Sequence, residues 1–114
     1  MRSREEALRD RNAPMEMTPD VFRELGHRLV DDIAEFMASI PKRPVNYDEA
    51  PSQIRALLPK GSIPNEGTAP DELMREVAPL LFDHSLLNGH PRFLAYITSS
   101  PAPIGVLADM LSAS

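Results

Sequence analysis

The sequence predicts a mainly α-helical protein with little or no sheet and no self-contained core. Two observations lead to this fold class. Apolar residues recur at helical spacing along the chain. The 114 residues include 12 prolines, twice the usual share of about 5%, and these prolines divide the chain into short pieces. Such pieces will struggle to close around one core, so we expect an extended series of helices.

The chain divides into three parts. Residues 1–17 are charged and poor in apolar groups, so we expect a disordered or frayed arm, or at best a marginal surface helix. Residues 18–89 should form a helical arm, with helices at about 19–40, 51–58 and 70–83. Residues 90–114 should form an extended segment followed by the start of another helix.

The helix of residues 19–40 has the clearest signals. Thr18 is a good N-cap, because its hydroxyl can accept a hydrogen bond from a free backbone N–H, and Pro19 suits the first helical position. Pro41 should end the helix. Burying a large apolar side chain is worth about 1.5–3 kcal/mol, so we expect the apolar stripe to pack against other protein. The stripe consists of residues spaced three or four apart: Phe22, Leu25, Leu29, Ile33, Phe36 and Ile40.

Weaker signals mark the remaining elements. Prolines at 51 and 59 frame the second helix, and Thr68 is a plausible cap for the third. Residues 93–97 fit either a strand or an extended loop. Ser99 or Ser100 could cap the final helix, which no sequence signal ends, so that the chain looks cut within it.

The composition argues against several functional classes. The net charge of −5 and the pI of about 5.1 disfavour a nucleic-acid-binding surface. Cysteine is absent, so neither disulfides nor thiolate chemistry are expected. No apolar run approaches the roughly 18 residues of a membrane span, and the N-terminus lacks the apolar region of a signal peptide. We therefore expect a cytoplasmic protein.

Few residues suggest catalysis. The three histidines, His27, His84 and His90, lack the spacing of a metal site, so we expect no metal. The loop residues His84 and His90 should make ordinary hydrogen bonds, and His27 lies on a predicted helix. No Gly-x-Ser-x-Gly motif and no glycine-rich phosphate loop occur. The hydroxyl residues Thr98, Ser99 and Ser100 precede a predicted helix, where free N–H groups attract anionic or polar ligands. Simple capping is the alternative explanation for them.

One stretch resembles a known family. The segments "HPRFLAY" and "ITSSPAPIGVLADML" resemble the region just before the large cofactor domain of the pyridoxal-phosphate-dependent group II decarboxylases, which include the aromatic-L-amino-acid, tyrosine, histidine and glutamate decarboxylases. Upstream, "FRELGHRLVDDIAEFMASIPKRPV", "APSQIRALLP" and "PDELMREVAPLLFDH" resemble the family's successive arm helices in the same order. The resemblance covers about residues 18–114.

The resemblance implies the role of this region. Family members are fold-type I enzymes and obligate dimers, in which the N-terminal helices form an arm over the partner subunit. Tyr96, Ile97, Thr98 and Ser99 then correspond to a wall of the substrate pocket, and Ser99 matches a hydroxyl residue that contacts the substrate side chain. The aromatic-amino-acid enzymes carry an aromatic residue at the position of Ile97, so the substrate stays open.

The family's cofactor is pyridoxal 5′-phosphate, held by a lysine that this chain lacks. The only lysines, Lys42 and Lys60, lie in proline-bounded loops and match no family lysine motif. We therefore expect no catalytic and no cofactor-binding residue in this chain. The cofactor domain should follow residue 114, and the chain alone should be inactive.

These observations give one interpretation and two alternatives. The chain is interpreted as the N-terminal segment of an L-amino-acid decarboxylase, with the homodimer partner subunit, the missing cofactor domain and the amino-acid substrate as partners. The main alternative is a non-catalytic helical interaction or dimerisation module. A family lyase that cleaves other C–C bonds, or a deaminating relative, is a third interpretation.

Overall fold

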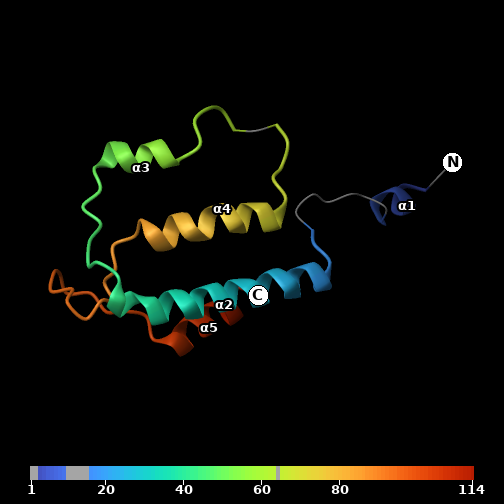
Figure 1. Cartoon of the computed structure of the whole chain (residues 1–114). Helices are drawn as coiled ribbons and strands as arrows, with labels where there is room; N and C mark the ends of the chain where they lie inside the picture. Colours follow the sequence, from blue (N-terminus) through green and yellow to red (C-terminus); the bar gives the residue numbers. More distant parts are fainter. Residues whose placement is uncertain (1–2, 10–15, 64) are drawn as a thin grey trace.

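The structure is a computed structural model that describes residues 3–9, 16–63 and 65–114. Within these residues the chain is helical and contains no β-strand, which confirms the predicted fold class (Figure 1). The elements in chain order are α1 (Arg4–Arg9), α2 (Pro19–Ser39), the 3₁₀ helix η1 (Ile40–Lys42), α3 (Pro51–Leu57), α4 (Pro70–Asp83) and α5 (Pro103–Ser112).

Helix α2 begins as its sequence predicts. The Thr18 hydroxyl accepts a hydrogen bond from the Val21 N–H at 3.3 Å, and Pro19 occupies the first turn. The α-helix ends at Ser39, and the chain then tightens into η1 around Pro41. Proline lacks the N–H that would continue the α-helical ladder, which accounts for this change.

Helices α3 and α4 also start with prolines. Leu58, expected in α3, instead has an extended backbone, because the residue before a proline, here Pro59, is disfavoured in the α region. The expectation that Thr68 caps α4 is wrong. The cap position belongs to Ala69, which makes no side-chain hydrogen bond, and Thr68 lies one residue too early.

The segment before α5 forms no strand and provides no hydroxyl cap. Residues 93–100 follow a path of bends and irregular backbone, so the extended-loop interpretation is the correct one. The N-cap of α5 is Ala102, without a side-chain hydrogen bond. The expectation that Ser99 or Ser100 caps this helix is therefore wrong, because helix formation starts only at Pro103.

The N-terminal arm contains a short helix, α1. The Glu6 N–H donates to the Ser3 hydroxyl at 3.2 Å, and the Ser3 N–H donates to the Glu6 carboxylate at 2.7 Å. This reciprocal pair is a capping box, and its Ser-x-x-Glu signature is present in the sequence. Of the expected disordered or frayed arm of residues 1–17, residues 1–2 and 10–15 lie outside the described residues.

Helix α2 is the central helix of the structure. Figure 1 shows α4 along one side of α2 and α5 along the other. Phe36 of α2 stacks on Phe82 of α4, with ring centroids 4.5 Å apart and an interplanar angle of 13°. On the α5 side, Met110 approaches Gly26, where a Cβ would lie 4.0 Å from its Cε. Helix α3 lies apart, beyond α4.

This arrangement of helices is extended and buries few residues. The Cα radius of gyration is 19.2 Å, against about 13 Å for a compact domain of this length. The accessible surface is 10087 Å², against roughly 6,200 Å² for a compact monomer of this mass. In the described part of the chain the only buried residues are Ala78, Leu87 and His90. The predicted lack of a self-contained core is confirmed.

The stripe of α2 is accordingly only partly covered. Leu29, Ile33 and Phe36 are half-buried, and Phe22 is 58% exposed.

Among the described helices, none combines the length and the apolar character that crossing a lipid bilayer requires.

Candidate functional site

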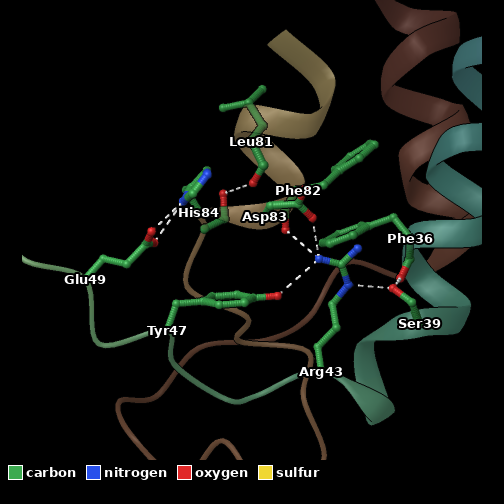
Figure 2. A network of polar contacts seen from close by, with 10 residues as sticks. Phe36, Ser39, Arg43, Tyr47, Glu49, Leu81, Phe82, Asp83 and His84 are labelled. Carbon is green, nitrogen blue, oxygen red and sulfur yellow. Dashed lines mark hydrogen bonds and ion pairs between the residues drawn. The ribbon is translucent and has the colours of Figure 1, made fainter. Parts of the chain in front are cut away.

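Arg43 joins three parts of the chain directly after η1 (Figure 2). Its Nε donates to the Ser39 hydroxyl at 2.7 Å, at the end of α2. Its Nη1 donates to the Asp83 carboxylate at 2.7 Å and to the Phe82 carbonyl at 3.2 Å, both at the end of α4. The same nitrogen lies 3.1 Å from the Tyr47 hydroxyl, in the connection that follows.

The surroundings of Arg43 keep it charged. Its hydrogen bonds, first to Asp83 and then to Tyr47, raise the pKa of its guanidinium above the already high ordinary value. The guanidinium carbon also lies 5.1 Å from the centre of the Phe36 ring, within the range of a cation–π interaction. Because the Asp83 side chain is 52% exposed, the ion pair alone adds little stability. The combined contacts instead hold the C-terminal ends of α2 and α4 together.

A second link lies beside the first. Nδ1 of His84, directly after α4, is 2.8 and 2.9 Å from the two carboxylate oxygens of Glu49, which precedes α3 (Figure 2). Both side chains are about three-quarters covered. This pair holds the connection between η1 and α3 against the end of α4.

His90 is buried in a turn behind Arg43. Its Nε2 donates to the Arg43 carbonyl at 2.9 Å, and its Nδ1 accepts from the Arg92 N–H at 3.0 Å. Only the neutral tautomer with hydrogen on Nε2 can make both bonds. His84 and His90 thus make ordinary hydrogen bonds, as predicted, and His27 is exposed on α2. The described residues bring no three metal-ligating side chains together.

The four residues predicted as a pocket wall lie on an exposed loop. Tyr96 is 82% exposed, Ile97 is fully exposed, and Thr98 and Ser99 are exposed as well. Tyr96 has a φ of 63°, in the left-handed region that costs a residue of this size about 1–2 kcal/mol. The carbonyl of Ser99 accepts from the Asn88 side chain at 3.4 Å. Their contact with a substrate stays a prediction.

Three open grooves flank α2, and none is lined by the four predicted wall residues. The groove between α2 and α4 has a volume of about 540 Å³ and mixes apolar residues with the charges of Arg28, Asp32 and Glu35. The groove toward Met110 has a volume of about 580 Å³. The third groove is lined by residues 87–89 together with residues of α2, α4 and α5. It has a volume of about 440 Å³, and its lining is largely apolar.

Sequence reasoning missed Arg43. Its partners lie four and forty residues away, and neither helical periodicity nor a short motif reports such contacts. The nearest signal was the pair of prolines around "KR", which indicates a stiff connection but not its partners.

No family model matches the chain, whereas individual proteins do. Phenylacetaldehyde synthase of Petunia hybrida is 32% identical over 97 residues, which cover 85% of this chain and 19% of that protein. The rat aromatic-L-amino-acid decarboxylase is 32% identical over 90 residues, or 79% of this chain and 18% of the relative. The enzyme of that name from Bacillus atrophaeus is 30% identical over 98 residues, or 86% and 20%.

The chain is homologous to the N-terminal part of the group II aromatic amino-acid decarboxylases. The resemblance predicted from the sequence is thereby confirmed. The chain spans about a fifth of the length of the curated relatives that it matches.

The residues of this chain do not fit the cofactor that the resemblance implies. Pyridoxal 5′-phosphate needs a lysine within a pocket and donors for its phosphate group. Lys42, at the end of η1, and Lys60, in the loop after α3, are both exposed, and neither lines a groove described above. No chemical step can be assigned to the cofactor from these residues.

Proposed function

We propose that this chain is the N-terminal segment of a pyridoxal-phosphate-dependent L-amino-acid decarboxylase, a carboxy-lyase. Helices α2, α3 and α4 serve as dimer-arm helices, residues 96–99 form part of the substrate pocket, and α5 starts the helix that leads into the cofactor domain. The homology to the N-terminal fifth of the decarboxylases carries this proposal. The extended shape and the partly covered apolar stripe of α2 support it, because such helices are suited to lie against a larger protein body.

The proposed pocket wall consists of Tyr96, Ile97, Thr98 and Ser99. Their exposure leaves them free to face protein or substrate outside this chain. Ser99 offers a hydroxyl to the substrate side chain, and Ile97 offers an apolar surface. The substrate is an L-amino acid, with an aromatic one as the first candidate because the relatives are named for aromatic amino acids.

Catalysis then depends on residues beyond this segment. The cofactor would be bound in a separate domain and would supply the electron sink for the carbanion that decarboxylation leaves. This chain alone would be inactive, and its partners would be that domain, a second subunit and the amino acid. We place the whole protein in the cytoplasm.

The decisive experiment begins with the gene. The reading frame should continue past Ser114 into a few hundred codons that include a cofactor-binding lysine. The protein encoded by the whole frame, supplied with pyridoxal 5′-phosphate, should release CO₂ from an aromatic L-amino acid. The 114-residue chain, treated in the same way, should release none and should develop no specific visible absorbance. A specific absorbance that disappears on changing Lys42 or Lys60 would overturn the missing-lysine part of the proposal.

The same experiment distinguishes two alternative functions. A stop codon directly after Ser114, with a discrete dimer of the chain, would favour a non-catalytic helical interaction module. The exposed apolar residues along α2 and α5 are the observation that suits such a module. The third candidate is a lyase or deaminating relative with another product. Because one relative is named phenylacetaldehyde synthase, the assay should measure aldehydes as well as amines.

A further inference from the structure

The loop that carries the proposed pocket wall needs an anchor. Its residues make few contacts within the chain: Leu94 is 94% exposed, and the following residues to Ser99 are exposed too. A pocket wall acts on a substrate only if it is held to within a fraction of an ångström. The position of the wall therefore depends on the residues that hold the two ends of this loop.

Both ends of the loop meet at one turn. At the start, the Phe93 N–H donates to the His90 carbonyl at 2.9 Å, and the Arg92 N–H donates to the His90 ring. At the far end, Asn88 donates to the Ser99 carbonyl at 3.4 Å. A Cβ on Gly89 would come within 3.3 Å of the Ser100 Cβ, so the returning chain passes close to the turn. Residues 88–90 thus form the base of the loop.

His90 in turn links this base to Arg43, directly after η1. This side chain is 4% exposed, and its Nε2–H donates to the carbonyl of Arg43. The same Arg43 is held by its own side chain to the ends of α2 and α4. A continuous path of hydrogen bonds therefore runs from the two helices through Arg43 and His90 to the loop.

We propose that Arg43 and His90 are positioning residues that set the place of the substrate-wall loop, residues 94–99, relative to α2 and α4. The assignment of this loop to a substrate pocket rests on the proposed function. The anchoring itself does not, because all of its contacts lie within this chain. Neither residue would touch the substrate.

The two ring nitrogens of His90 can be tested separately. In a His90→Asn variant, the short side chain can still accept from the Arg92 N–H two residues on, as asparagine does in turns, but it cannot reach the Arg43 carbonyl. In a His90→Gln variant, the longer amide can again donate to that carbonyl. The exposed His27 provides a matched control, His27→Asn.

The experiment measures distances by spin labels in the 114-residue chain, which has no cysteine to interfere. The labelled chain is diluted with an excess of unlabelled chain, so that self-association adds no distances between labelled copies. One pair, Asp31→Cys with Leu94→Cys, reports the loop against α2. A second pair, Asp31→Cys with Glu76→Cys, reports α4 against α2. We expect His90→Asn to broaden the first distance distribution and leave the second unchanged, with His90→Gln and His27→Asn close to the parent chain in both.

Two results would overturn the proposal. If His90→Asn leaves the loop distribution as narrow as in the parent chain, His90 is not the anchor. If it broadens both distributions, the residue supports the packing of α4 against α2 and has no specific positioning role. In addition, His90→Ala should speed exchange of the Arg92 amide about fivefold, the effect of losing one net hydrogen bond. None of these readouts depends on decarboxylase activity, so the anchoring can fail without affecting the proposed function, and the reverse is also true.

Discussion

At the scale of single residues, Arg43 shows how one side chain can organise an open structure. Helix α2, the connection at Tyr47 and the end of α4 are linked by one planar guanidinium with several fixed donors. Lysine would place one compact charge there and could not satisfy Ser39 and Asp83 together. Arginine at this position therefore contributes a fixed arrangement of hydrogen-bond donors as well as a positive charge.

Arg43→Lys should locally destabilise the contact between the ends of α2 and α4. We expect a loss of about 1.5–3 kcal/mol, the range for hydrogen bonds to charged groups, seen as faster amide hydrogen exchange at the end of α4. Arg28→Lys is the matched control, because Arg28 pairs with Glu24 at 3.2 Å on an exposed helix face. Equal exchange in the two variants would contradict the role given to Arg43.

Ser99→Ala separates a structural from a functional role of that hydroxyl. Because Ala102 is the N-cap of α5, the helical content of the chain should not change on circular dichroism. In the protein encoded by the whole reading frame, kcat/KM for the amino acid should fall about tenfold, the effect of one lost hydrogen bond to substrate. A loss of helix, or an unchanged kcat/KM, would contradict one half of this account.

At the scale of elements, the sequence predicts helix starts that depend on neighbouring residues. It does not predict which residue occupies the cap, because the cap depends on the exact register of the helix. Thr18 directly precedes Pro19, so both the cap and the start of α2 could be read from the sequence. Thr68 and Ser100 also stand before prolines that begin helices, but each lies one residue or more ahead of the actual cap. A hydroxyl near a helix start therefore indicates a helix without identifying its cap.

The capping difference gives a paired test. Thr18→Ala should lower the stability of α2 by about 1 kcal/mol, because it leaves the Val21 N–H without its partner. Thr68→Ala should leave α4 unchanged, because Thr68 does not occupy its cap position. Circular dichroism at low temperature measures both variants, and amide exchange is followed at Val21 for α2 and at Leu73 for α4. Similar losses in the two helices would contradict the assigned caps.

The candidate site was predictable only in part. The loop of Tyr96, Ile97, Thr98 and Ser99 was found by resemblance, since no spacing in the sequence distinguishes it from an ordinary connection. The anchor formed by Arg43 and His90 joins residues 47 positions apart. Local patterns do not contain such a pairing, because chain folding alone brings the two residues together.

At the scale of the whole molecule, the apolar faces of α2 and α5 determine behaviour. Phe22 and Ile104 are among the exposed large apolar residues on these helices. Surfaces of this kind favour association in water, at about 25 cal/mol for each Å² that is covered. The isolated chain should therefore self-associate at micromolar concentration.

Charges placed on these faces test that expectation. Phe22→Asp combined with Ile104→Asp should shift the chain toward monomer in sedimentation equilibrium. Ile63→Asp is the control, because Ile63 is 91% exposed in the loop before α4, where it belongs to no helix face. A parent chain that is monomeric at all concentrations, or a control that dissociates equally, would contradict the role of the helix faces.

The central claim is that these helices do not close around a core of their own. Small-angle X-ray scattering of the Phe22→Asp, Ile104→Asp double variant, at concentrations where sedimentation equilibrium finds it monomeric, tests it most directly. We predict a radius of gyration near the 19.2 Å of the structure. A value near the 13 Å or so of a compact domain of this length would contradict the claim.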